Sequence, residues 1–224
     1  FKGKVLVEKP LFAALPTRTP TYPFTLYIAY QLRFHPHIQR LKKRLQGKTI
    51  LSVKAHTGQH LSQWRPDRDM KQTYSAKRAE GGGVLRDLSH ELDLVQFLFG
   101  DATLTAARGG RLGDVTVDSE DTVDLQFTAR RCADISVHLN YLNETPRREW
   151  VVETTEGVYH LDMIAQAMRF NEKVESLPVA RNDAYLAMHH AVLEQGGAEV
   201  CSYEDGMRVM QMIASAEQQI QEAA

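Results

Sequence analysis

Hydrophobic and polar residues alternate through the middle of the chain, and this pattern predicts a sheet. The alternation runs through four segments, at residues 121–129, 132–142, 148–156 and 158–164. A period of two is that of a strand, whose successive side chains point to opposite faces of a sheet. The Glu156-Gly157 pair is typical of a tight turn between the last two segments. We therefore expect a run of antiparallel strands here.

Short apolar runs nearer the N-terminus predict three more strands. They lie at residues 5–7, 25–32 and 49–58. Three prolines between residues 12 and 23 argue against a regular helix there, because proline lacks the N–H that an interior helical position needs. The first two strands are separated by enough chain to be parallel neighbours, joined by an irregular connection.

Apolar residues at helical spacing predict four helices. They lie at residues 36–46, 81–100, 182–195 and 203–222. Pro36 suits the first turn of the first helix, and Asn182 and Ser202 are suitable N-caps for the last two. The order of these elements indicates an α+β fold. We expect a large, mostly antiparallel open sheet with helices on one face.

The balance of charges excludes one class of partner. The chain of 224 residues carries 27 basic and 28 acidic side chains, so it has no electrostatic footprint for nucleic acid. Leucines at helical spacing interleave the basic run at residues 40–44, which favours a solvated helix face over a nucleic-acid patch. No apolar segment reaches the roughly 18 residues of a membrane span.

The two cysteines, Cys132 and Cys201, form neither a disulfide framework nor a set of metal ligands. This cysteine usage fits a reducing compartment, so we expect a cytoplasmic protein. The sequence contains no H-E-x-x-H, C-x-x-C or G-x-S-x-G motif, and we expect no metal site.

The densest group of chemically competent residues follows a run of glycines. Asp87, His90, Glu91 and Asp93 fall on the predicted helix after Gly81–Gly83. A spacing of three places Asp87 and His90 on one helix face, where the carboxylate would orient the ring and favour its charged form. The N–H groups that follow the glycines would be free for an anion. The alternative is an acidic first turn that complements the helix dipole, with a structural, half-buried histidine.

A second candidate is Lys9, at the end of the first predicted strand. Glu8 and Lys9 place two charges where this strand leaves the core, and Pro10 cannot continue its hydrogen-bond ladder. Ligands of open α/β sheets bind at the carboxyl ends of the strands, so a lysine here is well placed for chemistry. A solvated ion pair is the alternative, and residues 4–11 alone favour it.

Four stretches, in this order along the chain, resemble the Gfo/Idh/MocA family of NAD(P)-dependent oxidoreductases. They are VLVEKPL at 5–11, AYQLRFHP at 29–36, the glycine run with its helix at 64–100, and the strands at 138–163. The resemblance implies NAD or NADP as the cofactor. It also implies hydride transfer between that cofactor and a sugar, an inositol or a nucleotide-sugar.

The resemblance further implies roles for individual residues. Lys9 would lie between nicotinamide and substrate and act in catalysis with Asp87 and His90. Partial desolvation near a cationic nicotinamide would lower the pKa of such a lysine, which suits general acid–base work. The cofactor would be contacted by Glu8, Lys9, Pro10 and Arg33.

The polar loop at residues 59–80 is expected to contribute to the substrate site. The predicted substrate-binding residues are Trp64, Arg65, Tyr74 and His90. Aromatic faces and guanidinium forks suit a polyhydroxylated or anionic sugar. The alternative is that Trp64 only pins the loop to the core.

The chain departs from the family pattern in three ways. Asp87 and His90 are three residues apart rather than four, a proline-rich stretch at 12–23 replaces a helix, and no G-x-G-x-x-G dinucleotide turn is present. We therefore expect residues 1–33 to be the last two strands of an incomplete Rossmann domain, and residues 34–224 to bind substrate and dimerise. The chain alone is expected to be inactive. The alternative is a non-catalytic sheet domain that dimerises or binds a sugar without cofactor.

Apolar residues occur at both sets of alternate positions in the predicted strands, which indicates that both faces of the sheet are apolar. Trp150 and Val152 point to one side of their strand, for example, while Val151 points to the other. The helices can cover one face, and the other would exceed the apolar patch that monomers usually expose. This predicts a homodimer, or a tetramer of such dimers, formed through the open sheet face.

Overall fold

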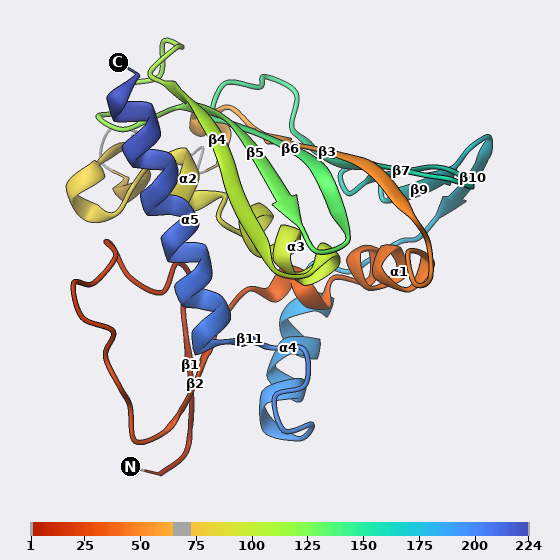
Figure 1. Cartoon of the computed structure of the whole chain (residues 1–224), viewed down its shortest axis with the longest axis horizontal. Coiled ribbons are helices and arrows are strands. Elements are labelled where there is room, and N and C mark those ends of the chain that lie inside the picture. The colour runs from red at the N-terminus through yellow and green to blue at the C-terminus, as the bar shows by residue number, and fades with distance from the viewer. Residues whose placement is uncertain (1, 65–72, 224) are drawn as a thin grey trace.

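The computed structural model describes residues 2–64 and 73–223, which form two sheets and a set of helices (Figure 1). Within these residues the larger sheet has eight strands in the order β10-β9-β8-β7-β3-β6-β5-β4. Their bounds are β3 Ile50–Gly58, β4 Ala102–Gly110, β5 Thr122–Ala129, β6 Cys132–Asn140, β7 Arg147–Thr154, β8 Gly157–Asp162, β9 Ala167–Phe170 and β10 Lys173–Ser176. β3 pairs with β6 in parallel, and the other neighbouring pairs are antiparallel. The predicted large, mostly antiparallel open sheet is confirmed.

Three strands of this sheet are not predicted by alternation in the sequence. β4 is rich in alanine, threonine and glycine, and β9 and β10 have only four residues each. They become strands because β4 pairs with the edge of β5, β9 with the edge of β8, and β10 with β9. Tertiary pairing of this kind overrides weak local preference.

A smaller sheet joins the two ends of the chain. Its strands are β1 Lys4–Val7, β2 Thr25–Ile28 and β11 Cys201–Ser202. β1 and β2 are parallel, as predicted, and β11 lies antiparallel to β2. β11 brings C-terminal residues into this sheet, so the small sheet contains residues from both sides of the predicted domain boundary at residue 33. That boundary stays a prediction.

The second strand is shorter than the predicted 25–32, which corrects the sequence analysis. β2 ends at Ile28, and the chain turns into the 3₁₀ helix η1, Gln31–Phe34. The turn carries Arg33 into the interior, where its guanidinium donates to both carboxylate oxygens of Asp93 at 2.6 and 2.8 Å. This buried ion pair fixes the direction in which the chain leaves the small sheet.

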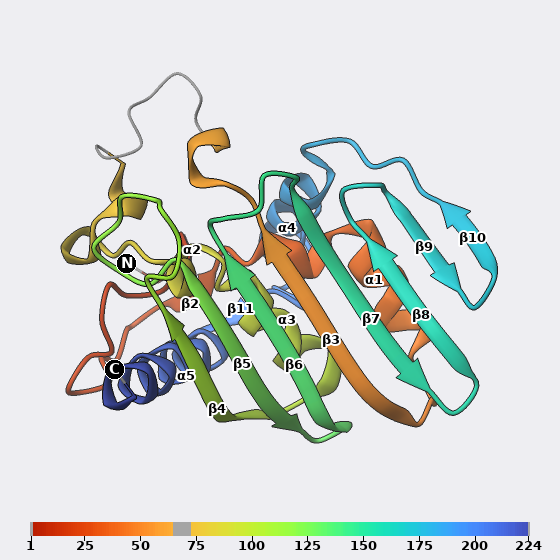
Figure 2. The same ribbon diagram turned by 90° about the horizontal axis from the view of Figure 1, so that it is seen from above.

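Helices cover one face of the larger sheet. The described helices are α1 Pro36–Arg44, α2 Val84–Asp87, α3 His90–Phe99, α4 Asp183–Leu193 and α5 Tyr203–Glu222, with 3₁₀ turns η2 Leu61–Gln63, η4 Tyr74–Ala76 and η5 Arg78–Glu80. Figure 2 shows α1, α3 and α5 behind the sheet. The core fills the space between, where the fully buried rings of Phe99 and Trp150 stack with centroids 6.4 Å apart. Each such side chain stabilises the fold by about 1.5–3 kcal/mol.

The C-terminal helices test the predicted caps. Ser202 Oγ accepts a 3.1 Å hydrogen bond from the Asp205 N–H, so the predicted cap of α5 is confirmed. Asn182 occupies the predicted N-cap position of α4, but its side chain makes no capping hydrogen bond within the described residues. The Asp183 carboxylate accepts from the Ala180 N–H in the turn that precedes the helix. None of the described helices is both long and apolar enough to cross a membrane.

The predicted helix at residues 81–100 is two helices, which is a second correction. α2 ends at Asp87 and α3 begins at His90, because Leu88 adopts a non-helical backbone with φ −99° and ψ 22°. Asp87 and His90 therefore flank a bend rather than share one helix face. The bend turns the end of α2 toward β1.

The glycine run serves packing rather than anion binding. A Cβ on Gly82 would lie 2.2 Å from the Tyr74 carbonyl oxygen, so no larger residue fits there. The N–H groups of Val84 and Leu85 donate to the carbonyl and the carboxylate of Glu120, each at 3.2 Å. The helix N-terminus predicted to be free for an anion is thus occupied by the chain's own carboxylate.

The open face of the larger sheet is polar, which overturns the prediction that both faces are apolar. Cross-strand partners form a polar row on this face, and its members are Arg108, Asp124, His138, His56, Glu149 and Asp162. Their strand neighbours, such as Val137 and Trp150, point to the helices and are buried. The register places the apolar side chains on one face, and exceptions such as Val158 are isolated.

Candidate active site

A cleft of about 280 Å³ lies where β3, the α2–α3 bend and the start of β7 meet the chain beyond β1. The residues that line it are Lys9, Thr57, Gly58, Gln59, Trp64, Asp87, Leu88, His90, Pro146, Arg147, Arg148 and Ile164. The fold thus brings together four predicted site residues that are distant in the sequence: Lys9, Trp64, Asp87 and His90.

Lys9 is held at the edge of this cleft by the α2–α3 bend. Its ammonium nitrogen donates a 2.6 Å hydrogen bond to the main-chain carbonyl of Asp87. Burial lowers the pKa of Lys9, the Asp87 carboxylate opposes this effect, and the positive charge of Arg148 adds to it. The net result is an amine that gives up its proton more readily than a solvated lysine.

Asp87 does not orient His90 as the sequence analysis expects. The carboxylate of Asp87 is buried and accepts a 2.8 Å hydrogen bond from the Tyr141 hydroxyl. Burial and this carboxylate raise the pKa of Tyr141 well above its ordinary value, so Tyr141 remains a donor. Within the described residues, the Asp87 carboxylate therefore bonds to Tyr141, which follows β6, and not to the imidazole of His90.

His90 is a neutral, buried group on the cleft wall. Its ring packs edge-on against Tyr30, with centroids 5.5 Å apart, and its Nδ1 is buried without a partner in the described part of the chain. Burial lowers the pKa of His90 well below its ordinary value, and Lys9 and Arg148 lower it further. This direction is opposite to the predicted one, because burial disfavours the charged ring and the nearby charges that act on it are cations rather than a carboxylate.

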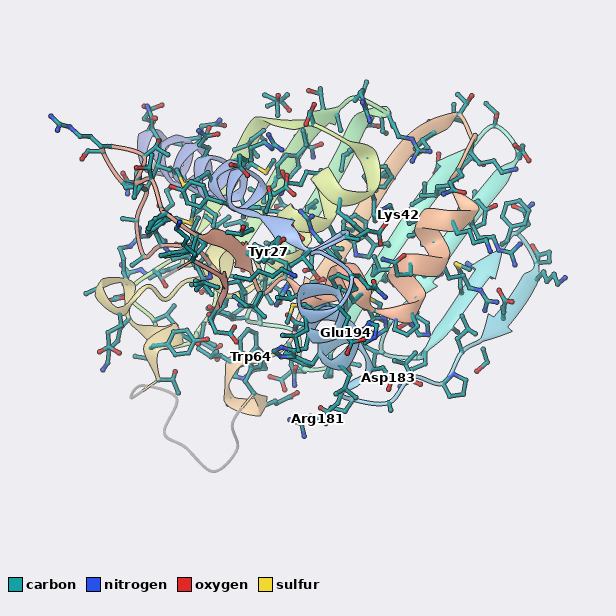
Figure 3. The ribbon with its side chains drawn as sticks, turned by 90° about the horizontal axis from the view of Figure 1, so that it is seen from below. Tyr27, Lys42, Trp64, Arg181, Asp183 and Glu194 are labelled. Carbon is teal, nitrogen blue, oxygen red and sulfur yellow. The ribbon has the colours of Figure 1, made fainter. Side chains whose placement is uncertain are left out.

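Trp64 lines the cleft and also anchors the segment that carries it. It follows η2, and Figure 3 labels it there. Its ring packs edge-on against Tyr141 at 5.4 Å, and its Nε1 is buried with no partner in the described residues. The geometry is compatible with both predicted roles, a substrate contact and a pin for the loop.

The remaining predicted residues lie elsewhere. Arg33 is buried and gives all three guanidinium nitrogens to Asp93 and Asp205, so its placement counts against the predicted cofactor contact. Tyr74 is 40% exposed on η4 and does not line the cleft. Glu8 and Pro10 flank Lys9 outside the cleft lining. Arg65 lies outside the described residues.

The sequence analysis missed the pair formed by Glu91 and Arg148. Arg148 Nε donates to Glu91 Oε1 at 2.8 Å, and Thr57 Oγ1 donates to the same oxygen at 2.6 Å. Glu91 is fully buried, while Arg148 reaches the cleft from the start of β7. The sequence shows an acid next to His90 and an arginine at the start of a predicted strand. Because the two residues are 57 positions apart, no local pattern indicates that they are in contact.

No three histidine, cysteine or acidic side chains within residues 2–64 and 73–223 are arranged to hold a metal ion. The chemistry available in the cleft is that of a half-buried amine, a neutral imidazole and a guanidinium. These groups suit proton transfer and the binding of oxygen-rich ligands.

Comparison with protein families decides the ancestry of the chain. The model of the GFO/IDH/MocA C-terminal domain matches residues 38–160, more than half of the sequence. The chain belongs to this family. The predicted resemblance is thereby confirmed, and the matched part of this GFO/IDH/MocA chain contains α1, the cleft-lining helices and β3 to β7. No curated protein matches it in sequence.

Solved structures share the fold of this GFO/IDH/MocA chain. Levoglucosan dehydrogenase in complex with NADH and levoglucosan superposes with a TM-score of 0.79 at 15% identity, over 98% of this chain and 72% of that one. UDP-N-acetylglucosamine 3-dehydrogenase from Acidithiobacillus ferrooxidans gives 0.71 at 20% identity, over 97% and 70%. An Agrobacterium radiobacter oxidoreductase in complex with NAD⁺, L-tartaric acid and magnesium gives 0.72 at 16%, over 90% and 64%.

Proposed function

We propose that this chain serves an oxidoreductase that moves a hydride between NAD or NADP and a hydroxyl or carbonyl carbon of a sugar, inositol or nucleotide-sugar. The observation that carries the proposal is Lys9, a half-buried amine with a lowered pKa in the same cleft as His90 and Trp64. The dehydrogenases that share the fold, with levoglucosan or a UDP-sugar in their names, support this substrate class.

Lys9 is the proposed proton-transfer residue. In the oxidation direction its neutral amine accepts the proton of the reacting hydroxyl at Nζ, while the hydride leaves the same carbon. In the reduction direction the ammonium returns that proton to the carbonyl oxygen. The hydrogen bond to the Asp87 carbonyl holds Nζ in place through both steps, and the carbonyl accepts from either protonation state.

His90 is proposed to position the substrate. Because its imidazole is neutral, one ring nitrogen donates and the other accepts, which suits a hydroxyl neighbour of the reacting carbon. Trp64 offers an apolar ring to the C–H face of a sugar. Arg65 and Tyr74 remain predicted substrate contacts from the same segment.

The residues at the end of β1 fit one part of a nicotinamide cofactor. Lys9 stands two residues beyond a parallel strand, at the kind of sheet edge where such ligands bind. When bound, the nicotinamide supplies or accepts the hydride. Glu8, Lys9 and Pro10 are the residues proposed to contact it.

The test is a dehydrogenase assay on the protein produced from its own gene, with NAD and NADP and a panel of sugars, inositols and nucleotide-sugars. Reduction of either cofactor in a Lys9-dependent manner is the expected result. Equal activity in the wild type and in Lys9→Met would rule out the proposed role of Lys9.

A second candidate function is a sheet domain that binds a sugar, or dimerises, without catalysis. The observation that favours it is the absence of any G-x-G-x-x-G turn from the sequence, since a dinucleotide pyrophosphate needs such a cradle. Fluorescence titrations with NADH and NADPH of the protein produced from its own gene separate the two. Saturable quenching supports the enzyme, whereas sugar binding without dinucleotide binding supports the alternative.

Self-association through the open sheet face remains a proposal, and the polar row on that face changes its expected character. A contact built on Arg108, Asp124 and Glu149 would pair charges rather than bury a large apolar area. Such a contact depends on the salt concentration. The predicted homodimer, or tetramer of dimers, is tested in this form below.

A further inference from the structure

Arg148 sits on a buried support that fixes the orientation of its guanidinium. Its Nε donates to Glu91 Oε1, which also accepts from the Thr57 hydroxyl. Glu91 is fully buried, whereas the Arg148 side chain is 25% exposed toward the cleft. Because Nε carries the internal bond, both terminal nitrogens remain available, and no hydrogen bond within the described residues engages them.

The surface of the cleft carries more basic than acidic side chains. Lys9, Arg147 and Arg148 line it, and Asp87 is its one acidic lining residue in the described part of the chain, while the carboxylates of Glu91 and Glu149 pair with Arg148 and Arg147 from behind the lining. The Asp87 carboxylate is already bonded to Tyr141, and His90 is neutral because of its burial. Arg148 is close enough for its charge to lower the pKa of both Lys9 and His90. A negative group on the ligand would therefore meet the terminal nitrogens of Arg148 beside two further basic side chains.

We propose that Arg148 binds an anionic group of the substrate, so that the substrate is a carboxylate- or phosphate-bearing sugar or polyol. This inference rests on the proposed function for the identity of the reacting hydroxyl, which lies at Lys9. A guanidinium held by Nε presents its two terminal N–H groups in parallel, the geometry that matches the two oxygens of a carboxylate or phosphate. A neutral hydroxyl would fill only part of this fork.

A purely structural role for Arg148 makes a different prediction. If Arg148 served only to neutralise Glu91, then its replacement would affect the free energy of unfolding and no ligand preference. If it binds the substrate anion, then replacement removes the preference for anions over neutral sugars. The two roles are separated by measuring both quantities in the same variants.

The experiment is calorimetric titration of the full chain with D-glucuronate, D-glucose 6-phosphate and D-glucose. The wild type is expected to bind at least one of the anions roughly 10- to 100-fold more tightly than D-glucose, as hydrogen bonds to charged groups allow. The two anions distinguish a carboxylate from a phosphate. Equal affinities for all three, or no binding of either anion, overturns the proposal whatever the variants do.

Three variants assign the effect to Arg148. Arg148→Gln should abolish the preference for anions, and Arg181→Gln, an exposed arginine in the turn before α4, should keep it. Should Arg148→Gln fail to fold because it strands Glu91, the neutral pair Arg148→Gln with Glu91→Gln restores a matched interior and must also lose the preference. A folded variant that lacks Arg148 and still prefers anions sinks the assignment.

Failure of this inference is distinguishable from failure of the proposed function, because none of these titrations contains a nicotinamide. Arg148-dependent anion binding without dehydrogenase activity would support the anion site and reject the proposed oxidoreductase function. Dehydrogenase activity on neutral sugars that is the same in the wild type and in Arg148→Gln would support the proposed oxidoreductase function and reject the anion site.

Discussion

The ammonium nitrogen of Lys9 lies 2.6 Å from the main-chain carbonyl oxygen of Asp87. The acceptor belongs to the last residue of α2, at the bend that separates α2 from α3. The bend thereby places an amine from the end of β1 beside the imidazole that opens α3. A single long helix over residues 81–100 would not end at this carbonyl.

Replacing Lys9 by methionine keeps most of the side-chain volume and removes the proton-transfer group. In the active protein we expect Lys9→Met to lower kcat by about 10²–10⁴-fold, with little change in cofactor affinity. Steady-state kinetics with a saturating cofactor measure this. Lys173→Met, an exposed lysine on β10, is the control and should retain full activity.

The pH dependence of oxidation should follow the Lys9 amine. Burial holds its pKa below the ordinary lysine value of 10.5, and the neutral form is the one that accepts a proton. The rate should therefore rise with pH through a midpoint below 10.5. Arg148 lowers this pKa, so Arg148→Gln should move the midpoint to higher pH. A profile that is flat, or that falls as the pH rises, would contradict the assignment of Lys9 as the base.

The 224-residue chain is expected to show no measurable binding of NADH or NADPH by calorimetry. Its sequence lacks the glycine-rich turn that lets a pyrophosphate approach a helix N-terminus, and Glu120 fills the N-terminus of α2. Binding with a micromolar Kd would mean that the pyrophosphate is held by a different part of the chain.

Arg33 is expected to contribute to stability rather than to cofactor affinity. It is buried with Asp93 and also donates to Asp205, so Arg33→Met leaves the buried Asp93 carboxylate without a cation and with the Gln96 amide as its remaining side-chain donor. Breaking a buried pair from one side costs about 3–5 kcal/mol of the free energy of unfolding. Urea denaturation measures this cost. The exposed Lys77–Glu80 pair is the control, and Lys77→Met should cost less than about 1 kcal/mol.

The polar row on the open sheet face should make self-association sensitive to salt. At micromolar concentration and low ionic strength, light scattering should give at least twice the monomer mass, and about 1 M salt should lower it. Asp124→Lys, in the middle of the row, should weaken the dimer more than the same change at Asp101, which precedes β4. A monomer under every condition would mean that this face does not bind a second copy.

The elements that the sequence predicts well are those decided by neighbouring residues. The β7–β8 hairpin follows from alternation on either side of Glu156-Gly157, and α5 begins at its Ser202 cap and spans the predicted residues 203–222. In both places the local pattern and the tertiary structure agree, which is the condition under which pattern reasoning works.

The features that sequence reasoning missed depend on contacts between distant residues. The α2–α3 bend depends on Glu120 at the head of α2 and on the Tyr141–Asp87 bond across 54 residues. The charge state of His90 depends first on its burial and then on Lys9 and Arg148, which lie far from it and from each other in the sequence. Helical spacing alone paired His90 with Asp87, because it contains no information about β6 or β7.

The position of β3 has a consequence for how the protein folds. β4, β5 and β6 form one meander and β7 to β10 form another, each from strands adjacent in the chain, and β3 lies between the two. β3 leaves the ribosome before either partner, yet it can complete its ladders only after residues 132–154 are present. Each meander can form from local contacts within microseconds to milliseconds, whereas inserting β3 closes the longest loops of the larger sheet and is slowed by their entropy. The cleft, whose walls include Thr57 on β3 and Arg148 on β7, is therefore assembled in this last step.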